Sequence, residues 1–273
     1  MFKTSSYGDV KRFDLSRTLV GRGRYWTTAY LVDGMLVDSG CAHSAPELAR
    51  ALSGVPVARI VNTHSHEDHI GANGMLQRQR AGLDILAHPL ALPVLADPRH
   101  ALSLHPYRRV LWGWPQPSQA QPVLDGTVIE TAQYAFHVVY TPGHSPDHLC
   151  LHEPRQGWVF SGDLFVGGQD RALGAGYDIW QIIASLKQIA ALRPAVLFPG
   201  SARVRDDPAG SLAAKIDYLE TLGQRVLDLH GQGRPLSEIV RAVCGSPMLI
   251  EFITLGHFSR RRLVLSCLGL NGA

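Results

Sequence analysis

The sequence has few cysteines, and no two of them form a Cys-x-x-Cys pair. The four are scattered along 273 residues, at Cys41, Cys150, Cys244 and Cys267. A chain of this length with four dispersed cysteines is not a disulfide scaffold, so we expect reduced and mostly buried thiols. The first residues also lack the apolar stretch of a signal peptide, which favours a cytoplasmic protein.

Long apolar runs and a strong excess of one charge are lacking as well. No run approaches 18 apolar residues, so the sequence predicts no membrane span. The formal net charge of +3 is too small to favour a nucleic-acid partner. We interpret the densest basic run, residues 260–262, as the solvated face of a helix. The hydrophobic content of 45% is ample for a packed core.

A cluster of metal-ligating residue types follows a predicted buried strand at 58–62. Its members are His64, His66, Asp68 and His69. Side chains two apart in an extended segment point the same way, so the first two histidines can bind one metal together. The chain then turns, which lets the aspartate and the third histidine face a neighbouring position. Imidazole and carboxylate suit zinc, iron and similar metals, so this stretch predicts a metal site.

Other predicted strands also end just before a polar residue of a metal-ligating type. These residues are Asp38, His144 and Asp163. Open sheets in α/β folds usually carry their chemistry at the carboxyl ends of the strands. We therefore expect these side chains to lie near the histidine cluster.

The order and spacing of these four blocks resemble those of the metallo-β-lactamase-fold hydrolases, a superfamily that includes glyoxalase II, lactonases and several nucleases. The similarity covers roughly residues 18–205. It implies an α/β fold, a four-layer αββα sandwich with a C-terminal helical appendage. The catalytic domain would span 1–206 and the helical region 207–273. Many functions share one fold, so the resemblance is far more specific for the fold than for the substrate.

The resemblance also implies a role for each ligand. A first metal would be held by His64, His66 and His144, and a second by Asp68, His69 and a bridging Asp163. Asp38 would support the site without touching a metal, because a carboxylate of this kind fixes the orientation of a ligand. Zinc is the expected cofactor, one or two ions per chain, with iron or manganese as alternatives.

One position departs from the family pattern. The family usually has Pro-Gly-His after its last strand, where this chain has Ser201 after residues 199–200. The second metal would then lack its usual remaining imidazole. A water or another side chain could fill the gap, or the second metal could bind weakly. His257 is a candidate replacement ligand, although an ordinary packed or exposed histidine is the simpler interpretation.

The ligand set predicts a hydrolase. A metal held in this way keeps an open position for water and lowers the pKa of that water from about 15.7 to about 7. Asp68 would orient the water and accept its proton. We expect a small-molecule acyl substrate, either a carboxylic ester, a thioester or a lactone. The alternatives are a phosphodiesterase or nuclease, an iron-dependent oxidoreductase resembling persulfide dioxygenases, or a binding protein without catalysis.

Several regions outside the ligand blocks could shape the site. His148 and Tyr177 are candidates for substrate binding, although packing explains either of them equally well. Residues 89–122 contain seven prolines and predict a loop-rich insertion. Its Trp112 and Trp114 could form a pocket wall, although simple packing of the insertion explains them at least as well. Beyond residue 207 only helical patterns recur. These C-terminal helices would roof the active site or form a homodimer contact; a helix-turn-helix DNA reader fits the weak charge poorly.

Overall fold

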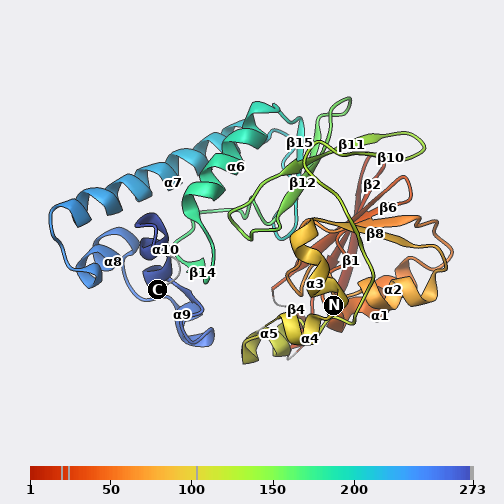
Figure 1. The fold of residues 1–273 in the computed structure, drawn as a ribbon, viewed down its shortest axis with the longest axis horizontal. Helices are drawn as coiled ribbons and strands as arrows, with labels where there is room; N and C mark the ends of the chain where they lie inside the picture. The colour runs from red at the N-terminus through yellow and green to blue at the C-terminus, as the bar shows by residue number, and fades with distance from the viewer. Residues whose placement is uncertain (20, 24, 103, 271–273) are drawn as a thin grey trace.

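Two β-sheets packed face to face form the centre of the molecule (Figure 1). The computed structural model describes residues 1–19, 21–23, 25–102 and 104–270. In spatial order, the larger sheet consists of β1 (Phe2–Tyr7), β2 (Val10–Leu15), β5 (Thr27–Val32), β6 (Met35–Val37), β7 (Arg59–Val61), β8 (Asp84–Ala87) and β9 (Gln121–Pro122). The smaller sheet consists of β10 (Val128–Glu130), β11 (Ala135–Tyr140), β12 (Leu149–Glu153), β13 (Trp158–Gly162) and β15 (Val196–Pro199).

Alternation along the strands explains why the sheets are covered on both faces. On β13, Phe160 faces the core between the two sheets, whereas Val159 faces the core beneath the later helices. On β6, Val37 faces the other sheet and Leu36 faces the opposite side. Successive side chains of a strand point to opposite faces, so strands that are apolar at every position must be buried on both faces.

Helices cover the two outer faces. The larger sheet is covered by η1 (Ala42–Ser44), α1 (Ala45–Ala51) and α2 (Asn73–Gln79), and the smaller sheet by α6 (Ile179–Ala191) and α7 (Pro208–Gly231). Asp178 caps α6 by accepting hydrogen bonds from the backbone of its first turn. The layers are therefore helix, sheet, sheet and helix, which confirms the predicted αββα sandwich. Two further strands, β3 (Thr18–Leu19) and β4 (Arg22–Gly23), form a small hairpin.

The proline-rich insertion is more regular than its composition predicts. It folds into four short helical elements, η2 (Pro89–Ala91), α3 (Leu92–Ala96), α4 (Pro98–Ala101) and α5 (Pro106–Leu111). Each of them has a proline in its first two positions. Proline fits the first turn of a helix because its missing N–H would be unpaired there anyway. The prediction of a loop-rich segment is confirmed for residues 112–120, which contain no helix or strand. It was wrong for the part before residue 112, because the prolines there begin helices rather than interrupt them.

Three C-terminal helices, α7, α8 (Leu236–Cys244) and α10 (Arg260–Cys267), share one hydrophobic core with α6 and the smaller sheet. The short helix α9 (Leu249–Ile253) has no buried residue and lies outside this core. The helix α7 has 24 residues, whereas α9 has only five. A two-stranded pairing of β14 (Leu173–Gly174) with β16 (Phe258–Ser259) ties this region to the segment before α6. The division at residues 206 and 207 stays a prediction. No helix in the described ranges is both long and apolar enough to cross a membrane.

Candidate metal centre

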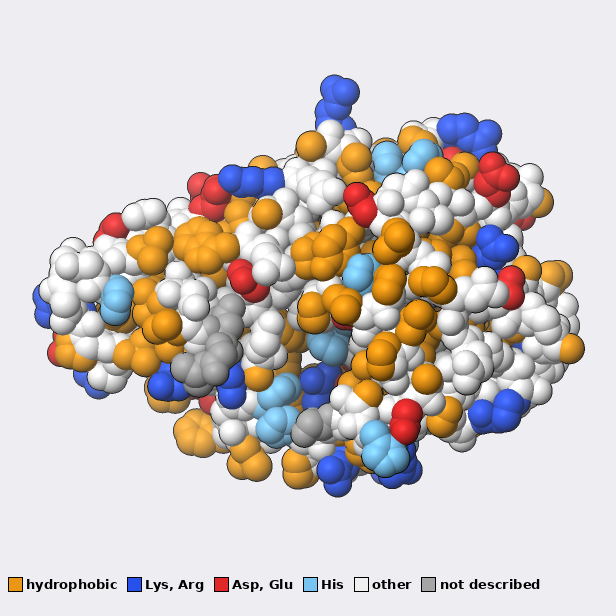
Figure 2. Space-filling view, in the orientation of Figure 1, with side chains coloured by type: hydrophobic (Ala, Val, Ile, Leu, Met, Phe, Trp, Pro, Cys, Tyr) orange, Lys and Arg blue, Asp and Glu red, His pale blue; other side chains and the backbone are white. Residues whose placement is uncertain are grey.

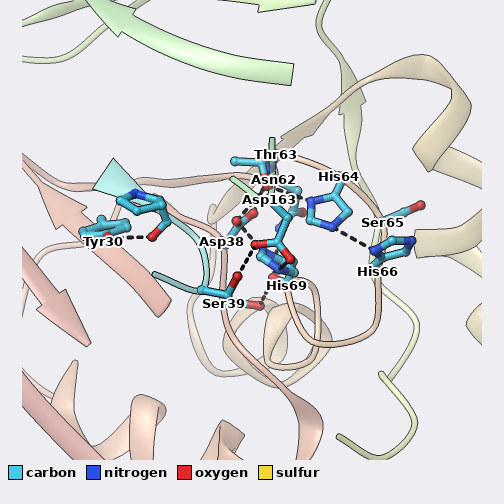
Figure 3. Close-up of polar contacts among 12 residues, drawn as sticks. Tyr30, Asp38, Ser39, Asn62, Thr63, His64, Ser65, His66, His69 and Asp163 are labelled. Carbon is cyan, nitrogen blue, oxygen red and sulfur yellow. Dashed lines mark hydrogen bonds and ion pairs between the residues drawn. The ribbon is translucent and has the colours of Figure 1, made fainter. Parts of the chain in front are cut away.

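Three imidazoles converge at the carboxyl ends of the central strands. His64 and His66 lie in the turn after β7, and His144 lies in the turn after β11. Nδ1 of His66 is 3.0 Å from Nε2 of His64 and 3.0 Å from Nε2 of His144 (the His64–His66 pair is drawn in Figure 3). These nitrogens are close enough to share one metal ion. The tight turn after β7 thus brings together the residues that the sequence pattern singled out.

A second group forms beside the first. His64, His69 and Asp163 place their ligand atoms within 4.8 Å of one another. Nε2 of His69 is 3.5 Å from Oδ2 of Asp163, and the same carboxylate oxygen is 3.9 Å from Nε2 of His144. Asp163 therefore lies between the two groups, as expected for a bridging carboxylate.

Asp38 fixes the protonation of two of these imidazoles. Its Oδ2 accepts hydrogen bonds from Oγ1 of Thr63 and from Nδ1 of His69, each at 2.8 Å. The hydroxyl of Thr63 has one proton, which it donates to Asp38, so it must accept from Nδ1 of His64 at 3.0 Å. Both rings therefore carry their proton on Nδ1 and leave Nε2 as a lone pair, the form that binds a metal.

The donor set fits a bound cation. Burial, followed by the neighbouring histidines, lowers the pKa of His64 well below its usual value. Burial likewise lowers the pKa of His144 to about 3. Among the described residues, the buried Nε2 of His69 has no hydrogen-bond partner. The lone pairs of these neutral imidazoles converge, and an unpaired ring nitrogen and a carboxylate lie beside them. Zinc or a similar cation would bind to these groups and balance the charge of the carboxylate.

The charges around His69 also favour a bound cation. Burial opposes protonation, but the carboxylates of Asp163 and Asp38 raise the pKa of this imidazole well above its usual value. In turn, His69 and then His144 lower the pKa of Asp163 against the opposing effect of burial. The charges that surround this ring therefore favour a positive charge at this position.

Asp68 and Ser201 line the cavity beside these groups but occupy different places in the network. Asp68 is buried and belongs to neither three-residue group. Ser201 donates a hydrogen bond of 2.9 Å to Oδ1 of Asp163. A Cβ at the preceding Gly200 would lie 2.7 Å from Cε1 of His69, so a residue with a side chain there would displace this ring. Ser201 thus orients Asp163 through a hydrogen bond.

His257 is not a replacement ligand in this structure. Its Nδ1 is 2.7 Å from the hydroxyl of Tyr107, its ring packs on His105, and it belongs to neither ligand group. Burial, followed by the charge of Arg108, lowers its pKa to about 4. The packed interpretation of His257 is therefore the better one. Tyr107 lies on α5, so the insertion supplies the hydrogen-bond partner of His257.

The two candidate substrate residues differ in position. His148 is fully buried, is 2.9 Å from Oγ1 of Thr141 through Nδ1, and is absent from the cavity wall. Its position agrees with the packing role that the sequence analysis left open beside substrate binding. Tyr177 is half-buried and lines the cavity, with its ring centroid 4.5 Å from that of His144. Of the two, only Tyr177 can contact a molecule in the cavity.

A cavity of about 470 Å³ opens over His66, His144 and Asp163, which belong to the two candidate ligand groups. Figure 2 shows histidine and basic side chains gathered around a hollow in the lower middle of this face, bordered by apolar side chains. Its wall combines segments far apart in sequence. They are residues 25–27, the helix α5, several residues between 164 and 177, and α9 with β16. No sequence pattern predicts the contributions from Tyr25, Arg108 and Ile250. Of the two tryptophans considered as wall residues, Trp112 lines the cavity and Trp114 does not.

Comparison with known protein families identifies the family of this chain. A model of the metallo-beta-lactamase superfamily matches residues 23–201, about two thirds of the chain. The chain belongs to the metallo-beta-lactamase superfamily. The matched region of this superfamily member contains every residue of both ligand groups.

Two curated relatives are hydrolases by name. Hydroxyacylglutathione hydrolase of Legionella pneumophila (strain Lens) is 31% identical over 150 residues, which are 54% of this chain and 49% of that protein. Atrochrysone carboxyl ACP thioesterase of Aspergillus fumigatus is 25% identical over 197 residues, 71% of this chain and 55% of that protein. The chain thus spans about half the length of these relatives.

Solved structures share the fold over most of the chain. A beta-lactamase domain protein from Burkholderia ambifaria has a TM-score of 0.67 at 20% identity, and the match covers 98% of this chain and 89% of that one. The protein TTHA1623, solved in a di-iron-bound form, has a TM-score of 0.56 at 29% identity, with coverages of 72% and 96%. The first likeness includes the C-terminal helices and confirms the predicted fold class.

Replacing Ser201 with histidine should strengthen a second metal site. Serine is a poor ligand for zinc, so we expect the wild-type protein to lose one metal readily on dialysis. The variant Ser201→His should retain about two metals per chain where the wild type retains about one, because it adds an imidazole beside Asp163. Elemental analysis after dialysis measures this. Two tightly held metals in the wild type, unchanged by the substitution, would contradict the prediction.

Proposed function

We propose that this protein is a metal-dependent hydrolase of carboxylic thioesters, esters or lactones. The observation that carries the proposal is the convergence of three neutral imidazoles, with His69 and Asp163 beside them, at the base of a cavity with mostly apolar walls. The names of two relatives, a hydroxyacylglutathione hydrolase and an acyl carrier thioesterase, support an acyl substrate. A small molecule suits a cavity of this volume.

The metal would be held by His64, His66 and His144, with a second ion at His69 and Asp163. When bound, it supplies a water of lowered pKa and polarises the acyl oxygen. Zinc is the proposed ion, one or two per chain. The di-iron form of a protein 29% identical to this one supports iron as the alternative. The four described cysteines are free and buried, which agrees with a reducing, cytoplasmic location.

The chain's own residues divide the remaining work. Asp68, which lines the cavity, orients the attacking water and accepts its proton. Asp38 and Thr63 keep the ring protons of His64 and His69 away from the metal. Tyr177 lies over His144 and offers a hydroxyl to the substrate. Apolar wall residues hold the acyl group and exclude water around it.

A substrate panel tests the proposal. Protein purified without chelator should contain at least one zinc-like metal per chain and hydrolyse a thioester, an ester or a lactone, and removal of the metal should abolish that activity. The panel should include a bis-phosphodiester. Cleavage of the phosphodiester alone would assign the chain to the phosphodiesterase class, and inactivity of the metal-loaded protein on every acyl substrate would refute the proposal.

A further inference from the structure

A buried ion pair connects the ligand stretch to the insertion. Glu67, between the ligands His66 and Asp68, is completely buried, and its Oε1 accepts a hydrogen bond from Nε of Arg108. Arg108 lies on α5 and is itself 9% exposed. Oε2 of Glu67 has no hydrogen-bond partner among the described residues. The ion pair with Glu67 therefore holds the guanidinium of Arg108 by its Nε atom, next to the turn that contains His64 and His66.

The rest of this guanidinium is available to the cavity. Arg108 is the one lysine or arginine among the described residues that line the cavity, whose wall also includes His66 and Asp68. Within the described ranges, its side chain makes a hydrogen bond through Nε only, and its two terminal amino groups are not among the buried atoms that lack a partner. The ring of Trp112, 5.4 Å from its Cζ, supports it from the side.

A purely structural role explains this arrangement less well. A buried ion pair contributes little net stability, because the cost of removing both charges from water offsets their attraction. A tether between α5 and the turn would be served as well by apolar residues. The next residue, Arg109, is exposed and donates to the backbone carbonyl of Leu104, so the helix has another arginine that serves a structural contact. The cavity wall also includes Asp68, but among the described residues the two terminal amino groups of Arg108 make no hydrogen bond to a protein group. A guanidinium held in this way in a cavity wall points to an anionic ligand.

We infer that Arg108 binds a carboxylate carried by the substrate and that Glu67 holds the guanidinium in place for it. This inference rests on the proposed hydrolysis of acyl substrates. Two parallel N–H groups match the two oxygens of a carboxylate, and the terminal amino groups of Arg108 form such a pair. The carboxylate can stand on the acyl part of the substrate or on the leaving thiol, since both parts meet at the metal centre.

Three matched thioesters separate these sources. Hexanoyl N-acetylcysteamine is neutral, adipoyl N-acetylcysteamine adds a carboxylate to the acyl part, and hexanoyl N-acetylcysteine adds one to the thiol. The test variant is Glu67→Gln with Arg108→Met, which removes both charges together and leaves no unpaired buried ion. Arg108→Lys keeps the charge without the paired N–H groups, and Arg109→Met is the control on the same helix. Melting temperature and metal content are measured for every variant.

The double variant should raise KM at least about tenfold for one carboxylated thioester or both, the size expected for a lost charge-assisted hydrogen bond. KM for the neutral thioester should stay within about twofold, Arg108→Lys should lie between, and Arg109→Met should match the wild type. The thioester that changes identifies the position of the carboxylate. An equal change for all three thioesters, no change for any, or a loss confined to kcat would overturn the inference.

A binding measurement makes the test independent of hydrolysis. The thioethers that correspond to the three thioesters cannot be cleaved, and the tryptophans of the cavity wall, Trp26 and Trp112, report their binding through fluorescence. The wild type should bind a carboxylated thioether at least about tenfold more tightly than the neutral one, and the double variant should lose this preference. A wild type that shows the preference but hydrolyses nothing would refute the proposed function and leave the inference standing. Absence of any preference would overturn the inference.

Discussion

Replacing His66 with alanine should remove the metal and the hydrolytic activity together. Its Nδ1 lies 3.0 Å from the Nε2 atoms of both His64 and His144, so it is the central member of the three-imidazole group. Loss of a partner that only orients a ligand costs about 10–100-fold in metal affinity, and loss of a ligand itself should cost more. We expect less than about a tenth of the wild-type metal content after dialysis and no measurable turnover.

The variant His137→Ala is the matched control. His137 lies on β11, the strand that leads to His144, but it is exposed and outside both ligand groups. Its metal content and activity should equal those of the wild type. Melting curves of both variants, recorded with excess chelator, separate the loss of a ligand from a loss of folding. Full metal content in His66→Ala would show that the ligand assignment is wrong.

The second large effect is expected from Asp38→Asn. An amide nitrogen in place of Oδ2 donates to Oγ1 of Thr63 and to Nδ1 of His69, where the carboxylate accepts. Thr63 must then donate its proton to His64, so both rings carry a proton on Nε2 and lose the lone pair that faces the metal. The shapes of the two side chains are nearly the same. We expect metal affinity to fall about 10–100-fold, measured by competition with a chromogenic chelator.

The backbone at this position makes asparagine a fair replacement. Asp38 has a φ of 58°, and asparagine tolerates this left-handed conformation better than most residues. Asp33, with a φ of 46°, is an aspartate with the same backbone conformation in the hairpin between β5 and β6, so Asp33→Asn is the control. Equal metal affinity of Asp38→Asn and the wild type would mean that the tautomers are set by something other than this carboxylate.

The metal ligands could be predicted because they are close in sequence or follow strand ends. His64, His66 and His69 lie within one turn, and their spacing alone specifies that they can converge. His144 and Asp163 follow the predicted strands β11 and β13, which both pair with β12 in the sheet and therefore end at the same edge. The layered fold was predicted from the resemblance to the superfamily, and the strands β13 and β15, buried at nearly every position, agree with it.

The cavity wall could not be predicted, because its residues come from segments whose packing is decided by tertiary contacts. Arg108 stands in a proline-rich stretch with no ligand spacing, and its partner Glu67 was passed over as a residue between two ligands. His257 was considered a candidate ligand from residue type alone, but the hydroxyl of Tyr107 is its partner. The helix α9 is five residues long, too short for a periodic pattern, yet Ile250 and Ile253 form part of the wall.

Titration of the metal-free protein with zinc tests the central claim most directly. The protein is stripped with a chelator, the chelator is removed, and zinc is added in steps while bound metal and hydrolysis of hexanoyl N-acetylcysteamine are measured on the same samples. The account predicts no turnover without metal and a rate that rises in proportion to zinc bound at His64, His66 and His144, until that site is filled at about one ion per chain. Undiminished hydrolysis by the metal-free protein, or zinc bound without any gain in rate, would contradict it.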